Sequence, residues 1–285
     1  MGAIGALSLV LQLYSAQPIL ISGSCKYKTA KGHAALLQAV VDTTENNKNL
    51  TRLQVVSLAL DGESCRRKAL ANLTYIASLA ASLPIYDQLI NLELMDYFVG
   101  PDDITTDKDY KHVFKRLCNT ILRDNGCVVL GVRLMHAVIQ KHLKDCGLTD
   151  VHINHVLNPT DKQDIVLAYS LLKDLWSLPL ADLTLSTLTY TKAHEALCVY
   201  GTMSYYLMFP YLCIDLLLSK QLEHLSAAIH LIMALYVLDD AQSQFIPTIL
   251  FVDISIMVKN TFFCVAKAKV DHPNEPFFLV LLGTN

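Results

Sequence analysis

The segment from Leu53 to Leu60 (LQVVSLAL) is a nearly continuous run of apolar residues. A strand that is apolar on both faces is typical of a sheet that helices cover on each side. The pair Asp61-Gly62 follows directly, and this dipeptide commonly forms a turn that ends a strand. The run therefore predicts a buried strand, and it restricts the fold to one in which helices enclose a sheet.

Short apolar runs alternate with helical patterns through the first 123 residues. In the helical patterns, apolar side chains recur every three or four positions and mark one buried face. The predicted strands are 18–22, 53–60 and 92–99, and the predicted helices are 32–43, 69–80 and 106–123. Because strands alternate with helices, this part predicts an α/β core with a mixed sheet.

Helical patterns dominate the chain after about residue 130. The predicted helices are 132–146, 160–175, 190–208, 211–238 and 246–270. A final apolar run covers Phe277–Leu282 and ends in Gly283-Thr284-Asn285. We therefore expect an α/β core over 1–130, an all-α insertion region over 131–270, and the start of a returning core segment over 271–285.

The composition predicts a folded chain that binds nucleic acid only through a local patch. Hydrophobic residues make up 53% of the chain and charged residues 17%, which suits a large core and argues against disorder. The net charge is −3, so no global positive field attracts nucleic acid. No apolar stretch reaches the roughly 20 uninterrupted residues of a spanning helix, so we expect an intracellular protein without a membrane segment.

Asp61 is the first residue that points to chemistry. Sites in open α/β sheets form at the carboxyl ends of strands, and Asp61 follows a predicted strand directly. A carboxylate in this position binds a metal ion while its strand stays rigid. The alternative interpretation is structural, because Asp-Gly is also an ordinary turn.

A second candidate region begins with four acids and continues into the segment KDYKHVFKRLCNTILR. Helical spacing places Lys108, Lys111, Lys115 and Asn119 on one face, with His112 and Arg116 beside it. One interpretation is a ridge that contacts DNA phosphates next to a metal site. The other is a solvated helix face whose N-terminus is stabilised by Thr106 as the cap and by Asp107 and Asp109 near the helix dipole.

Several blocks in this order resemble a known family. They are PILISG, the pair Gly32-His33, LQVVSLALDGESCRRKAL and TDKDYKHVFKRLCNTILR. Together they resemble the central block of P-element-type and THAP-like DNA transposases, and still more the fungal relatives related to the Kyakuja–Dileera–Zisupton elements. A strand in that family ends in Ser-Asp-Gly, and its Asp, matched here by Asp61, is the second catalytic carboxylate.

A later block of the family reads Asp-x-x-His-x-x-Lys-x-x-Arg-Asn. The matching residues here are Asp109, His112, Lys115 and Asn119, while Cys118 stands where the family usually has Arg. The stretch 158–175 resembles the helical segment that follows in the family. The resemblance thus implies that Asp109 is a second catalytic candidate and that the face from Lys108 to Asn119 contacts DNA.

The resemblance implies an RNase H-like core interrupted by a helical insertion, a nuclear location, and Mg²⁺-dependent DNA cleavage and strand transfer. The family's first catalytic Asp belongs upstream of PILISG, and its last acid belongs to an Asp-x-Leu-Glu motif just after a segment like FFLVLLGT. Neither lies within the 285 residues. We therefore expect a transposase-derived piece, truncated at both ends and inactive, in which Asp61 is a vestigial catalytic residue and metal ligand.

Two other classes of function also fit the sequence. The apolar region 200–260 is suited to a helical module that binds other proteins or a second copy of this chain. The high apolar fraction also leaves a membrane-associated protein as a third possibility. Strong salt-dependent DNA binding favours the transposase interpretation, whereas oligomerisation without DNA favours the helical module.

Overall fold

The computed structural model describes residues 2–4, 17–20, 29–59, 64–159, 161, 164–179, 187–238, 244–277, 279 and 282. The chain divides into two compact units. The first unit combines Met1–Asp109 with Ile256–Asn285, and the second unit is Tyr110–Ser255. The sequence led us to expect boundaries near residues 130 and 270 instead.

The strands of the first unit are short and form three pairs. β1 (Gly2–Ile4) pairs with β2 (Gln17–Leu20), and β4 (Ala77–Ser78) pairs with β5 (Phe98–Val99), both antiparallel. β3 (Ser57–Ala59) and β6 (Thr105–Asp107) run parallel, with Ser57 opposite Thr105 and Ala59 opposite Asp107. Within the described ranges every sheet has two strands, so the protein has a mixed α/β fold rather than one wide sheet.

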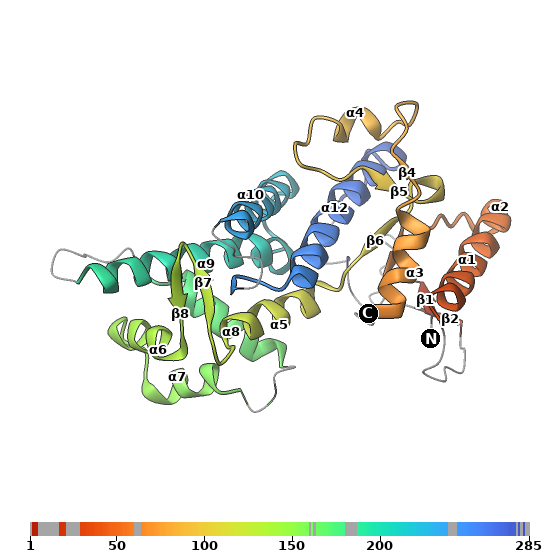
Figure 1. Ribbon diagram of the computed structural model, residues 1–285. Coiled ribbons are helices and arrows are strands. Elements are labelled where there is room, and N and C mark those ends of the chain that lie inside the picture. Colours follow the sequence, from red (N-terminus) through yellow and green to blue (C-terminus); the bar gives the residue numbers. More distant parts are fainter. Residues whose placement is uncertain are drawn as a thin grey trace. The chain divides into compact units, whose positions relative to one another are not determined.

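The helices of the first unit surround these strands (Figure 1). They are α1 (Ala30–Asn46), α2 (Lys48–Thr51), α3 (Ser64–Thr74), α4 (Tyr86–Leu89), the 3₁₀ turn η2 (Pro101–Asp103) and the larger part of α12 (Thr248–Asp271). α1 starts where the Thr29 hydroxyl accepts a hydrogen bond from the Gly32 N–H, which satisfies one of the free donors of the first turn. The helix predicted over 32–43 is thereby confirmed.

Two apolar clusters hold the first unit together. One contains Leu58 of β3, Leu70 of α3 and Ile104, with Leu37 and Val41 of α1 packed against it. The other consists of Leu79, Ile85, Leu89, Val99, Phe263 and Ala266. α12 therefore supplies core side chains from a part of the sequence more than 150 residues away from the strands.

The second unit is built around α9 (Leu188–Leu212). Its other elements are α5 (Tyr110–Ile121), β7 (Cys127–Val129), β8 (Val132–Leu134), α6 (His136–Asp145), α7 (Asp150–Leu157), α8 (Ile165–Trp176), α10 (Leu218–Val237) and the start of α12. The Tyr200 hydroxyl of α9 donates to the Leu117 carbonyl of α5 at 2.8 Å. Tyr211, also on α9, stacks on Tyr110 with ring centroids 4.9 Å apart.

Several expected elements differ in extent. The strands predicted over 53–60 and 92–99 are reduced to 57–59 and 98–99. The helix predicted from residue 106 begins at Tyr110, because 105–107 pair with β3 instead. The region 131–270 is not all-α, because β8 forms a hairpin with β7 across Leu130 and Gly131, both in the left-handed region. Half of the final run 277–282 lies outside the described residues, and Leu279 and Leu282 are buried.

α12 is long and apolar enough to cross a membrane by length and composition, which the sequence analysis did not anticipate. In its most apolar window, however, 61% of the residues are buried within the protein. A helix that packs in a protein core passes the same test, so this observation is weak support for a membrane span. α12 also buries Asp253, Lys259, Asn260 and Lys267, whose polar groups have partners inside the protein.

Candidate functional site

Asp107 is a buried carboxylate at the end of a parallel strand in the first unit. It is the last residue of β6, opposite Ala59 of β3, and only 6% of its surface is exposed. Asp61 follows Ala59 by two positions in the sequence but lies outside the described residues. Asp107, which the sequence analysis treated as an acid near a helix N-terminus, therefore lies at the end of β6, and the neighbouring strand β3 leads in the sequence to Asp61.

Burial dominates the electrostatics of Asp107. It raises the pKa of the Asp107 carboxyl from 3.8 to about 7, against the smaller lowering effects of the Lys108 N–H and the Asn260 side chain. The Lys108 backbone N–H donates to Oδ1 at 2.8 Å and fixes one carboxyl oxygen. The negative charge of the nearby Asp109 raises the pKa further. An acid in this state gains or loses its proton near neutral pH, as functional carboxyls often do.

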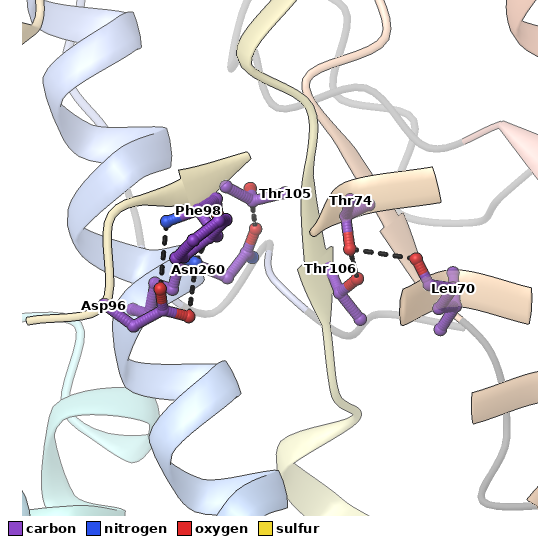
Figure 2. A network of polar contacts seen from close by, with 8 residues as sticks. Leu70, Thr74, Asp96, Phe98, Thr105, Thr106 and Asn260 are labelled. Atoms are coloured by element: carbon purple, nitrogen blue, oxygen red, sulfur yellow. Dashed lines mark hydrogen bonds and ion pairs between the residues drawn. The ribbon is translucent and has the colours of Figure 1, made fainter. Parts of the chain in front are cut away.

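A chain of buried hydroxyls and an amide surrounds β6 (Figure 2). The Thr105 hydroxyl donates to Asn260 Oδ1 of α12 at 2.6 Å. On the other face, the hydroxyls of Thr106 and Thr74 share a hydrogen bond of 2.6 Å, and Thr74 also donates to the Leu70 carbonyl at 3.0 Å. β6 is therefore held from α3 on one side and from α12 on the other.

Asn260 carries a buried donor that lacks a hydrogen bond. Its side chain is fully buried, and its Nδ2 makes no hydrogen bond of ordinary geometry among the described residues, although the side chain lies close enough to Asp107 to lower the pKa of that carboxyl. Its Oδ1 already accepts from Thr105 and lies 3.6 Å from the Cys264 thiol, which donates to it. A buried polar group without a partner costs stability, so its retention next to a buried acid marks a candidate site.

Two buried lysines of α12 hold the segment 96–103. Lys259 forms an ion pair of 2.9 Å with Asp96, donates to the Phe98 carbonyl, and lies 4.7 Å from the centre of the Tyr75 ring. Lys267 donates to the Asp103 carbonyl at 2.6 Å. Burial lowers the pKa of both lysines, and their acidic neighbours oppose that effect. These cations have structural partners, and they fix the loop that leads into β6.

The predicted DNA-binding residues do not share one exposed face. Lys108 is buried, with 6% of its surface exposed, and Asp109 is half-buried. On α5, His112 is exposed, whereas Lys111, Lys115, Arg116 and Asn119 are half-buried. The spacing could not reveal the burial of Lys108, because it results from the strand geometry of 105–107 rather than from a helix.

Arg116 has a structural partner. Its guanidinium forms an ion pair with Asp253, whose side chain is 4% exposed, and Asp253 lies on the part of α12 that belongs to the second unit. Arg116 itself keeps 32% of its side chain exposed. The pairing spans 137 positions in the sequence, so no local pattern signalled it.

No group of three or more His, Cys, Asp or Glu side chains is placed to hold a metal ion in the part of the chain that the structure describes. Asp61 is not part of that search, because its placement is outside the described residues. The chemistry that the described site supports by itself is thus proton exchange at Asp107 and hydrogen bonding through Asn260.

The comparisons with known proteins concern the fold. No protein-family model and no curated protein matches this chain. The solved structure of the Drosophila P element transposase strand transfer complex is similar, with a TM-score of 0.52 and 17% sequence identity. The match covers 87% of this chain and 55% of the transposase chain, so this chain spans about half the length of that protein. At this identity the likeness shows a shared fold and nothing finer.

Proposed function

We propose that this chain derives from a DNA transposase and that its first unit is part of an RNase H-like core. The observation that carries the proposal is the parallel pairing of β3 with β6. β6 ends at Asp107, and β3, its neighbour, ends two residues before Asp61 in the sequence. The fold shared with the P element transposase supports it. The proposed ancestral reaction is Mg²⁺-dependent DNA cleavage and strand transfer, and the proposed location is the nucleus.

Carboxylates are ligands of the type that Mg²⁺ prefers, because it binds oxygen ligands. Asp61, Asp107 and Asp109 would hold the ion, which when bound activates water or a 3′-hydroxyl and stabilises the leaving oxygen. The protein's own contribution is to orient Asp107, since the Lys108 N–H and the burial by α12 fix its carboxyl group. Two-metal cleavage requires carboxylates that converge on ions roughly 3.5–4 Å apart. We propose that these 285 residues alone do not meet that requirement and that the chain is inactive in cleavage.

We propose residual DNA binding through α5. Lys111, His112 and Lys115 offer charge or hydrogen bonds at the surface, and Asn119 follows one turn later. Lys108 and Arg116 contribute less than the spacing suggested, because Lys108 is buried and Arg116 is paired with Asp253. Contacts of this kind fix a protein on the DNA backbone without reading the sequence.

The test is the salt dependence of binding to duplex DNA. Each neutralised phosphate contributes about −0.9 to the slope of log K against log salt. We expect the double substitution Lys111→Gln/Lys115→Gln to reduce the slope by roughly 1.8. The matched control is Lys141→Gln/Lys144→Gln on α6, where both lysines are exposed. An equal loss in both double variants would show that binding follows net charge rather than α5.

A second candidate function is that of a helical protein-interaction module. The observation that favours it is that three apolar side chains are exposed where α9 ends and α10 begins, namely Leu212, Ile214 and Leu217. We propose that a homo-oligomer would form through this part of the 200–260 region. Sedimentation at increasing protein concentration tests it, because Leu217→Asp should then shift the protein towards the monomer.

A further inference from the structure

Six aromatic rings form a continuous row across three helices of the second unit. Tyr169 and Trp176 lie on α8, Tyr205, Tyr206 and Phe209 on α9, and His224 on α10. The Trp176 ring lies 5.7 Å from both Tyr169 and Tyr205, nearly perpendicular to each. Tyr205 stacks on Phe209 at 4.8 Å, and His224 lies 5.5 Å from Tyr205 and 5.1 Å from Tyr206. We call these six residues the aromatic row.

The aromatic row differs from the core rings of the same unit. Tyr200 and Tyr211, also on α9, are essentially fully buried. All six members of the row are instead half-buried, so each packs on its neighbour and keeps part of its surface in contact with solvent. Half-buried rings leave part of their surface open to a ligand. The row is therefore a surface on which further rings can stack.

Positive charge lies at both ends of the aromatic row. The Lys173 ammonium group lies 6.0 Å from the centre of the Tyr169 ring. At the other end, Lys220 lies close enough to His224 to affect its titration and forms an exposed ion pair with Glu223 at 2.6 Å. Exposed ion pairs of this kind contribute little stability, so Lys220 can exchange its partner for a phosphate at low cost. The nearby Asp174 is paired with His152 at 2.6 Å.

His224 joins the row as a neutral ring. Burial, with a smaller contribution from Lys220, lowers the pKa of His224 below 6.5, while Glu223 opposes the shift. The imidazole is therefore uncharged at neutral pH and can stack like the other rings. Its Nδ1 is buried and lacks a hydrogen-bond partner among the described residues.

We propose that the aromatic row binds a single-stranded nucleic acid by stacking unpaired bases, with Lys173 and Lys220 on its phosphates. Aromatic side chains bind bases of any sequence because every base has a flat face, and flanking cations follow the backbone. A proline-rich peptide also packs on aromatic grooves, but it gives no role to the lysines. The proposal goes beyond the duplex binding assigned to α5, since it concerns unpaired strands and other helices.

The chain contains one tryptophan, Trp176, and it lies within the row. Its fluorescence therefore reports on the proposed site without a label. We expect oligothymidylate of roughly 16 nucleotides, a length within the range that single-strand binders cover, to quench the emission of the full chain in a saturable way. The apparent Kd should rise with salt, with a slope of about −0.7 in log K per phosphate contacted.

Two half-buried phenylalanines of the second unit provide a matched pair of variants. Phe209 stacks on Tyr205 within the row, whereas Phe251 stacks on Tyr236 at 4.2 Å outside it. Phe209→Leu should weaken binding roughly fivefold to a hundredfold, which corresponds to the loss of one stacked base. Phe251→Leu should leave the Kd within about twofold, because it removes no base-stacking ring. Lys220→Gln should flatten the salt slope by about 0.7.

Circular dichroism will show whether Phe209→Leu disturbs folding. If it does, the surface variant Lys220→Gln still tests the proposal. The proposal is overturned by an absence of quenching with oligothymidylate, by equal effects of Phe209→Leu and Phe251→Leu in folded proteins, or by an unchanged slope in Lys220→Gln. Quenching by a polyproline peptide with no dependence on salt would assign the row to a peptide instead. Loss of duplex binding in the α5 variants leaves all of these outcomes unaffected, so the two proposals fail separately.

Discussion

The Thr105 hydroxyl donates a hydrogen bond of 2.6 Å to Asn260 Oδ1 and joins β6 to α12 across 155 positions of sequence. Because β6 has three residues and, among the described residues, one neighbouring strand, this bond is a main determinant of where the strand lies. Asp107 is the next but one residue along β6, so the position of the candidate acid depends on the same contact.

The contact can be measured by a double-mutant cycle. Thr105→Val leaves the buried Oδ1 of Asn260 without its hydroxyl donor, and we expect a loss of about 1–3 kcal/mol in the free energy of unfolding. Thr105→Val/Asn260→Leu removes both polar partners and should restore most of that loss. Urea unfolding of the four proteins gives the coupling energy. Additive losses would show that the two side chains do not interact.

The stability of the protein should fall as pH rises from about 4 to about 7. The folded state holds a proton on Asp107 up to a pKa of about 7, whereas the unfolded value is 3.8, so the folded state binds the extra proton between these values. The contribution is full below the unfolded pKa and amounts to on the order of 4 kcal/mol. Asp107→Asn, which mimics the protonated form, should flatten this dependence in urea titrations at pH 5 and pH 8. The exposed Asp87→Asn should not.

Gly201 is required by the close approach of α8 and α9. A Cβ atom there would lie 2.5 Å from the Leu175 carbonyl oxygen, and backbone cannot move aside cheaply. We expect Gly201→Ala to destabilise the second unit by about 1–3 kcal/mol.

Gly32→Ala in α1 is the control, since its Cβ would meet only the Thr29 hydroxyl at 3.7 Å. That change should instead stabilise by roughly 0.5–1 kcal/mol, as Ala is the better helix former. Thermal melts of both variants decide the point.

Arg116 and Lys115 should respond differently to substitution. Arg116→Gln weakens an ion pair with the buried Asp253 carboxylate, so we expect it to lower the melting temperature with a small effect on DNA affinity. Lys115→Gln should lower the affinity for duplex DNA and leave the melting temperature nearly unchanged. Paired melting and binding measurements compare the two. The reverse pattern would assign phosphate contact to Arg116 and a structural role to Lys115.

Purified protein should not nick supercoiled plasmid in Mg²⁺. The reason is the proposal above that two-metal cleavage needs more converging carboxylates than these residues supply. Nicking that persists through purification and disappears in Asp107→Asn, but not in Asp87→Asn, would show that the strand-end carboxylates form a working metal site.

The helices were predictable because their signals are local and long. Periodic apolar residues revealed α1, α8, α9, α10 and α12 to within a few positions at most ends. β6 was predicted as the start of a helix, because Thr106 and Asp107 suit a capped first turn as well as a strand. Only pairing with β3, 48 positions earlier in the register, decides between them. Propensity over so few residues cannot outweigh a tertiary contact.

The candidate site was predictable only in part, for the same reason. Strand-end position identified Asp61 as a candidate, helical spacing identified the basic residues of α5, and the family resemblance added Asp109; these roles remain predictions. The sequence analysis named Asp107 but interpreted it as an acid that stabilises a helix N-terminus. Asn260 and the partner of Arg116 were not found, because each lies more than 130 positions from the residue that it contacts.

The division of the chain also sets an order of assembly during synthesis. The second unit is one uninterrupted stretch, Tyr110–Ser255, so all of its residues are synthesised before the last part of the first unit is made. At about 5–20 residues per second, the interval between Thr105 and Asn260 lasts roughly 8–30 seconds. During that time β6 lacks the hydrogen bond from Thr105 to Asn260 of α12. The first unit, which includes the earliest residues, can therefore be completed only after the second unit has been synthesised.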